Sequence, residues 1–236
     1  MAGRGKAAIK SETPERIVIK SPNFEVVELG IRGDAQLVSN NFSQEAIDQM
    51  KVEQEKGSQA KGKKSREKKD FEAGYQGSMH VSEEGWAGIP ATAFRAAMIR
   101  ACSTCGIEMT KAKMCFFILA DGYERLRGTP LVKILQREPE RFDAYVRNSN
   151  GSADIRARAR WTRGWECVLR VRFDKDLFSA ETVANLVERA GISVGVGAGR
   201  PFSTISAGQG WGTFNVISSP EGDVAPAPAS ASTKAA

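Results

Sequence analysis

Apolar residues alternate with polar ones in several short runs of the chain, and this pattern predicts β-strands. Three such runs follow one another near the start, at 17–19, 24–31 and 35–38, with a turn signal at Gly33-Asp34. The same kind of run predicts further strands at 114–119, 131–135, 142–146, 155–161, 168–173, 192–196 and 213–217. The chain is therefore expected to form at least one sheet of short strands.

Two segments have the spacing of amphipathic helices instead. The first begins at Pro90, and its apolar stripe is Phe94, Ala97, Met98 and Ala101. The second has Ser179 as its N-cap and Gly191 at its C-terminal end, and its stripe is Val183, Leu186, Val187 and Ala190. With the flanking strands at 166–173 and 192–197, this helix predicts a βαβ-type unit. Strands and helices together indicate an α+β domain over residues 15–217.

The most informative pattern of charge lies between residues 147 and 173, where arginines are frequent. The whole chain carries 34 basic and 28 acidic residues, a formal net charge of +6. The strand at 155–161, the turn Thr162-Arg163-Gly164 and the strand at 168–173 predict a hairpin with one apolar face. Its opposite face presents five arginines, namely Arg156, Arg158, Arg160, Arg170 and Arg172.

Like charges on neighbouring strands repel each other, so such a face needs compensation. Either carboxylates from elsewhere in the chain or a bound polyanion can supply it. Because few acidic residues lie in this segment, nucleic-acid contact is one hypothesis, and a solvated face with partners elsewhere is the other.

A second basic stretch lies in residues 43–73, which are interpreted as a mobile insertion that includes a short helix at 44–50. Within it, residues 61–69 carry six cations and one acid, and the cations are Lys61, Lys63, Lys64, Arg66, Lys68 and Lys69. The segment has no apolar periodicity. It acts either as a solubilising loop or as a mobile arm that contacts a phosphate backbone.

Glycine dominates the C-terminal part of the domain. The glycines are Gly195, Gly197, Gly199, Gly208, Gly210 and Gly212. Such a segment lets a backbone or a ligand approach closely, and its amides can hold phosphate oxygens. Arg200 lies within it, and Trp211 is a candidate for stacking on a base. A tight connection within a sheet is the alternative, and a dinucleotide fingerprint is not matched, because Arg200 and Pro201 stand where a helix would have to begin.

Several classes of protein are disfavoured by the rest of the sequence. No apolar run approaches the ~18 residues that cross a bilayer, and residues 1–10 lack the apolar stretch of a signal peptide, so a cytoplasmic protein is expected. His80 is the single histidine, which excludes multi-histidine metal sites. The pair Cys102 and Cys105 lacks a second pair at zinc spacing, so no metal or cofactor is expected. Residues 1–14 and 218–236 are expected to be disordered.

Two motifs resemble those of the RAMP superfamily, the CRISPR guide-RNA backbone subunits and processing nucleases. Residues 88–100, GIPATAFRAAMIR, are similar to the helix start "IPGSSLKGALR", with Ala91 and Thr92 in place of Gly-Ser. Residues 195–214 resemble the glycine-rich loop before the closing strand of that superfamily. They are also similar to the ending "VGIGEGRP…GWGxFEV" of a tailed-phage and prophage protein family, over roughly residues 70–217. The resemblance implies a ferredoxin-like antiparallel sheet of RAMP or RRM type, with helices on one face.

The function that this resemblance implies is binding of single-stranded nucleic acid, RNA or DNA, by a non-enzymatic phage or bacterial protein in the host cytoplasm. The arginine hairpin, the glycine-rich loop and the lysine arm would make the contacts, and a homo-oligomer or filament is possible for such a protein. The alternative from a different class is a protein-protein interaction subunit, an anti-defence or assembly factor, whose basic face docks an acidic partner.

Overall fold

The computed structural model describes most of the predicted domain. The described residues are 21–41, 47–48, 51–52, 70–136, 138–147, 151–203 and 208–217. The predicted termini, the strand at 17–19 and the cations between Lys61 and Lys69 lie outside these residues. Of the predicted helix at 44–50, only residues 47–48 are described, and they are helical.

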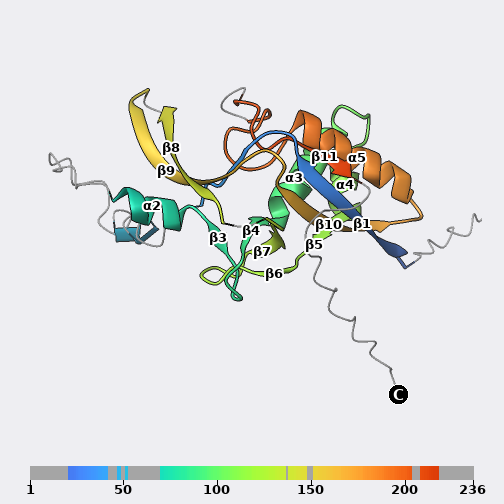
Figure 1. The fold of residues 1–236 in the computed structure, drawn as a ribbon. Helices are drawn as coiled ribbons and strands as arrows, with labels where there is room; N and C mark the ends of the chain where they lie inside the picture. Colours follow the sequence, from blue (N-terminus) through green and yellow to red (C-terminus); the bar gives the residue numbers. More distant parts are fainter. Residues whose placement is uncertain are drawn as a thin grey trace, which may run out of the picture.

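A four-stranded antiparallel sheet forms the centre of the molecule (Figure 1). Its strands, in spatial order, are β11 (Phe214–Ile217), β1 (Phe24–Gly33), β10 (Glu166–Asp174) and β5 (Phe116–Leu119). Every pair of neighbours is antiparallel. Along the chain the first strand is therefore central, and the last strand returns to pair with it at the sheet edge.

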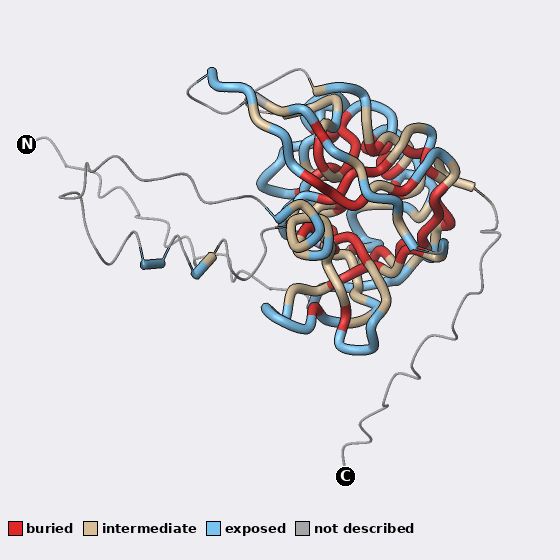
Figure 2. The backbone as a smooth tube through the Cα atoms, turned by 60° about the vertical axis from the view of Figure 1, so that its left-hand side comes forward, coloured by how far each residue is buried: buried red, intermediate tan, exposed pale blue. Residues whose placement is uncertain are grey.

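Helices α3 (Ala91–Cys102) and α5 (Ala180–Ser193) cover one face of this sheet, as both predicted stripes require. Every residue of the two stripes is buried, and the ring of Phe94 on α3 lies 5.7 Å from that of Phe214 on β11. The hydroxyl of Ser179 accepts a hydrogen bond from the amide of Thr182, which confirms the predicted N-cap. Figure 2 shows the buried residues gathered in this central region.

Two smaller antiparallel sheets extend the core. One has the order β2 (Leu37–Val38), β9 (Ala153–Trp161) and β8 (Glu140–Arg147), and its β8–β9 hairpin projects from the body (Figure 1). The other has the order β3 (His80–Val81), β4 (Ala87–Pro90), β7 (Pro130–Lys133) and β6 (Gly122–Tyr123). Helix α2 (Phe71–Gly77) packs on β9, and its N-cap Asp70 accepts two amide hydrogen bonds. The chain is thus an α+β protein with antiparallel sheets.

The predicted hairpin between residues 155 and 173 is wrong. β9 pairs with β8 and β2, whereas β10 pairs with β1 and β5, so the two arginine strands belong to different sheets. The turn at Arg163-Gly164 instead carries the chain from one sheet to the next, and Gly164 donates its amide hydrogen to the carbonyl of Gly33. Alternation predicted which side chains share a face, but it carried no information about which strand would be the neighbour.

The predicted strand at 192–196, and with it the βαβ unit, is also wrong. Helix α5 continues through Gly191 to Ser193, and the first residue beyond its C-cap with a left-handed backbone is Gly195, at φ 69°. Gly195 donates to the carbonyl of Ala190 and so ends the helix. Gly191 has another role, because a Cβ there would overlap the carbonyl oxygen of Phe214 on β11. It permits close packing of helix on strand rather than capping the helix.

Two smaller predictions need adjustment. The apolar run at 114–119 is divided, because Met114 and Cys115 end a short helix, α4 (Met109–Cys115), and only Phe116–Leu119 forms a strand. Pro90 precedes the first helical residue of α3 as its N-cap and is also the last residue of β4. A run of apolar residues cannot by itself distinguish a helix end from a strand start, because both bury their side chains here.

Candidate nucleic-acid interface

The predicted arginines divide into two groups with different surroundings. Arg170 and Arg172 lie on β10, on the face of the four-stranded sheet turned away from α3 and α5. We call this the open face and define it by Phe24, Val26, Phe117, Arg170 and Arg172. The other three arginines lie on β9.

Arg172 lies between two aromatic rings on the open face. Its guanidinium carbon is 5.0 Å from the ring centre of Phe24 on β1 and 4.9 Å from that of Phe117 on β5. The two rings meet edge to face at 6.0 Å. The side chain makes no hydrogen bond or ion pair with any described residue, and its Nε is buried without an acceptor. Phe24 is 40% exposed, so this positive, π-rich patch faces solvent.

Arg170 is neutralised within the chain. One of its terminal nitrogens lies 2.7 Å from the Asp121 carboxylate and 2.7 Å from the carbonyl oxygen of Ala120. Glu28 lies directly opposite Arg170 on β1. Of the two β10 arginines, Arg172 is therefore the one whose guanidinium can still bind an anionic ligand.

Two of the three β9 arginines also have acidic partners. Arg156 lies 3.5 Å from Asp154, and Arg160 lies 2.7 Å from Glu140 on β8 and stacks over the ring of Phe142. Carboxylates of the chain thus supply much of the compensation that the arginines need, as one of the two sequence hypotheses held.

Arg158 is the exception on β9. It is 8% exposed, and no described residue forms a hydrogen bond or ion pair with it. Burial, together with the positive charge of Arg156, lowers the pKa of the Arg158 guanidinium. A buried cation without a partner is costly, so Arg158, like Arg172, has unused capacity for an anion.

The glycines of the glycine-rich segment allow its own backbone to pack closely. All six predicted glycines have positive φ, and a Cβ on Gly208 or Gly212 would overlap a carbonyl oxygen of the same segment. The six are Gly195, Gly197, Gly199, Gly208, Gly210 and Gly212. Trp211 packs over Gly199 and meets Phe142 of β8 edge to face at 5.6 Å, so its ring is engaged within the protein. Arg200 is exposed, and one of its terminal nitrogens donates to the carbonyl of Gly197 at 3.1 Å.

The structure brings together residues that the sequence analysis missed. Phe24 and Phe117 were read only as strand positions, and nothing in the sequence linked them to Arg172. A buried carboxylate, Glu124, lies 2.9 Å from Nδ1 of His80, and no spacing signal connects the two residues. The cations between Lys61 and Lys69 lie outside the described residues, so the structure does not place them relative to this surface.

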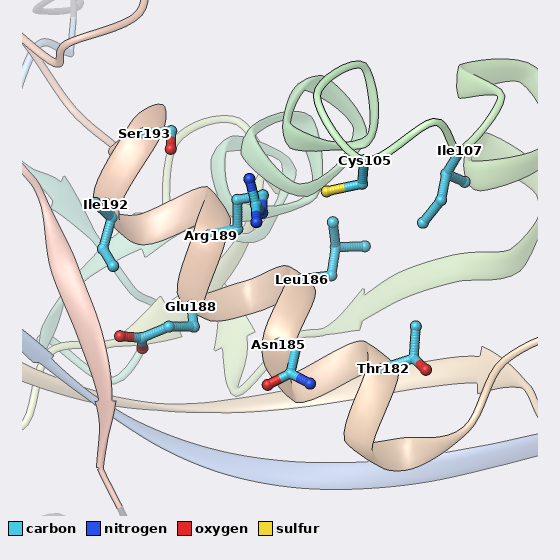
Figure 3. Close-up of a pocket in the computed structure, with 9 residues that line it drawn as sticks. All are labelled: Cys105, Ile107, Thr182, Asn185, Leu186, Glu188, Arg189, Ile192 and Ser193. Carbon is cyan, nitrogen blue, oxygen red and sulfur yellow. The ribbon is translucent and has the colours of Figure 1, made fainter.

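A groove in the described structure lies away from the open face. It has a volume of about 560 Å³ and runs between the outer side of α5 and the turn that follows α3 (Figure 3). Arg189 and Glu188 of α5 project beside it, and Cys105 faces it from the turn. Glu188 already accepts a hydrogen bond from the amide of Val216 on β11, so one of the groove's charged groups has a structural role.

Three further features concern metal ligands, thiols and membrane-spanning helices in the described part of the chain. No group of three or more His, Cys, Asp or Glu side chains is arranged there to hold a metal ion. All four cysteines are free, and burial raises the pKa of the Cys102 thiol to about 11. No helix among the described residues is long and apolar enough to span a bilayer.

No protein-family model matches the chain, and no curated protein matches it either.

Proposed function

We propose that the protein binds single-stranded nucleic acid through the open face of its four-stranded sheet, without catalysing a reaction on it. The observation that carries this proposal is Arg172 held between Phe24 and Phe117. Aromatic rings and guanidinium planes both stack on bases, and each stacked base contributes about 1–3 kcal/mol regardless of its identity. Such a patch therefore suits a flexible single strand better than a duplex, whose bases are already stacked.

The connectivity supports a ferredoxin-like assignment for this part of the chain. The elements run β1, α3, β5, β10, α5 and β11, and the last strand lies beside the first. A βαββαβ path with one face covered by two helices leaves the other face of the sheet available to a ligand. This arrangement agrees with the resemblance to RAMP proteins and with the position of the aromatic patch.

Arg158 and the segment around Arg200 are proposed as further contacts with the phosphate backbone. Arg158 is buried with no acidic partner among the residues that the structure describes, so an anion would stabilise it, and Arg200 is exposed close to the Gly197 turn. The three ion-paired arginines would add less, because their carboxylate partners already screen them.

The test is fluorescence anisotropy with labelled single-stranded RNA and DNA over a salt series. R172Q should weaken binding about tenfold or more and lower the salt slope by about one, because it removes a phosphate-seeking cation and a stacking partner. R163Q is the matched control: it removes the same charge from an exposed arginine that pairs with Asp34. Equal effects of the two variants would mean that only net charge matters and would reject the site.

A second candidate function rests on a different observation. Tyr145 and Ile155 lie opposite each other on the projecting β8–β9 hairpin and are 66% and 45% exposed. An apolar pair in this position favours a protein interface, although the interaction-subunit alternative from the sequence placed its interface on the basic face. Sedimentation velocity of wild type and the double variant Y145S/I155S would test the homo-oligomeric form: an assembly that dissociates in the variant supports it, and a wild-type monomer at all concentrations rejects it.

A further inference from the structure

An arginine from the helix side of the four-stranded sheet reaches around its edge strand, β5. Arg95 belongs to α3, which covers the other face of the sheet, and its Nε donates to the carbonyl of Phe116 on β5 at 2.8 Å. One of its terminal nitrogens donates to the carbonyl of Lys113 on α4. These two hydrogen bonds hold the side chain against the edge strand, so its guanidinium lies at the border of the open face.

The same guanidinium contacts the aromatic patch of the open face, which consists of Phe24, Phe117 and Arg172. The guanidinium carbon of Arg95 is 5.0 Å from the ring centre of Phe117, and that of Arg172 is 4.9 Å from the same centre. The two cations are thus within about 10 Å of each other, and neither forms an ion pair with a described carboxylate. Like charges at this distance repel, so a phosphate near both would stabilise them. The second terminal nitrogen of Arg95 is available for it.

A lysine continues this positive border onto α4. Lys113 is exposed, and its own carbonyl is the acceptor that Arg95 uses. The side chain of Lys111 lies elsewhere, because its Nζ is 5.7 Å from the ring centre of Phe178, which packs on the buried ring of Phe116. Two residues along a helix rotate a side chain by about 200°, so Lys113 lies on the side of α4 away from Phe178, which is the side of the open face.

Carboxylates border the aromatic patch at both ends of its strands. At one end, Asp121 pairs with Arg170, and Glu28 lies directly opposite that arginine. At the other end, Asp174 lies directly opposite Phe24. Carboxylates repel the phosphates of a nucleic acid, so neither end of the patch favours the passage of a strand.

The side of β1 offers no cation either, because residues 23–28 contain none. Among the described residues, the β5 edge is therefore the border of the patch that attracts a polyanion most. We propose that one end of the bound single strand leaves the open face over this edge, and that Arg95 and Lys113 hold its phosphates. The inference rests on the proposed function and adds to it the path of the strand beyond the stacked bases.

Fluorescence anisotropy tests this path with a labelled uridine strand of about 12 nucleotides, a length that one small single-strand-binding domain can cover. K113Q should weaken binding about fivefold at about 0.1 M salt and very little near 1 M, because one phosphate contact on a single strand contributes about 0.7 to the salt slope. K111Q is the matched control, since it removes the same charge from the same helix on the side of Phe178. An affinity of K113Q equal to that of wild type or of K111Q would overturn the proposal.

R95Q removes the second proposed contact, so it should lower the salt slope by a similar amount. It also removes two hydrogen bonds to carbonyls, and urea denaturation measures this loss of stability separately. R189Q is its matched control, because Arg189 is an exposed arginine on the outer side of α5 (Figure 3). Binding by folded R95Q as tight as binding by R189Q would contradict the contact. If R95Q fails to fold, the comparison of K113Q with K111Q still decides.

The outcomes separate this inference from the function on which it rests. Binding that R172Q weakens but K113Q and R95Q leave at the wild-type level would keep the open face and reject the path over β5. Weaker binding in K113Q and R95Q, with R172Q no different from R163Q, would keep the cationic edge and reject the aromatic patch as the base site. A wild-type protein that binds no single strand at low salt would reject both proposals.

Discussion

Glu124 supports the strongest stability prediction that the structure allows. Its carboxylate is 2% exposed and accepts three hydrogen bonds, from Nδ1 of His80, Nδ2 of Asn41 and the hydroxyl of Thr129, at 2.8–2.9 Å. The first two end on Oε1, and the third ends on Oε2. These hydrogen bonds draw together three separate parts of the chain, at Asn41, at His80 of β3 and in the loop after β6 that holds both Glu124 and Thr129.

The expected effect can be worked out from those bonds. Hydrogen bonds to a charged acceptor contribute about 1.5–3 kcal/mol each, so E124A, which leaves three donors unpaired, should lower the free energy of unfolding by at least about 4 kcal/mol. E124Q keeps the acceptor for His80 and Asn41, and its amide can donate to Thr129. Only the assistance of the negative charge is lost there, so E124Q should cost about 1–2 kcal/mol.

Urea denaturation of wild type, E124A and E124Q measures both effects, with an unchanged dependence on urea showing that the same unfolding transition is compared. E124Q is the matched control, because it keeps the size and shape of the side chain. If E124A cost less than about 1 kcal/mol, or if E124Q cost as much as E124A, the three hydrogen bonds would not be the source of stability and the reasoning would fail.

Three further predictions concern other parts of the fold. Burial lowers the pKa of His80 in the folded protein, so the unfolded protein binds a proton at this residue more readily. The free energy of unfolding should therefore fall as the pH drops below about 6.5, and it should fall less steeply in H80N. Urea denaturation from about pH 7.5 to about pH 5 measures both. Of the four thiols, exposed Cys105 should react rapidly with a disulfide reagent, whereas Cys102, which is buried and has a pKa of about 11, should react only on unfolding. Rapid reaction of two thiols in the folded protein would contradict this burial. G191A should lower the free energy of unfolding by about 2–3 kcal/mol, because the added methyl overlaps a β11 carbonyl. G74A should lower it by less than about 0.5 kcal/mol, because a Cβ there makes only ordinary van der Waals contact with Ala157.

Local patterns predicted the two longer described helices, α3 and α5, because each shows its buried face over a few consecutive residues, but they did not predict the short helices α2 and α4. The stripe of α3 and the stripe and N-cap of α5 all lie where the sequence predicts them. The end of α5 was misplaced because Gly191 has the residue type of a cap but the role of a packing contact. Which glycine ends a helix depends on the strand that packs against it, and that strand, β11, comes more than twenty residues later.

Local patterns could not predict which strands pair with each other. Alternation predicted that Arg170 and Arg172 share a face, and they do, but it gave them the wrong partner strands. Their actual neighbours, β1 and β5, come from distant parts of the chain and bring Phe24, Phe117 and Asp121 beside them. The candidate site therefore changed from five equivalent arginines to two, Arg158 and Arg172, that have distinct surroundings and no ion-pair partner among the described residues.

The most direct test of the central claim is a zero-length ultraviolet crosslink between the full chain and a uridine-rich single strand, mapped by mass spectrometry. Bases stacked on the open face should give adducts in the peptides that contain Phe24 and Phe117, and R172Q should reduce both. Adducts confined to other peptides, with those two unmodified, would contradict binding through the open face.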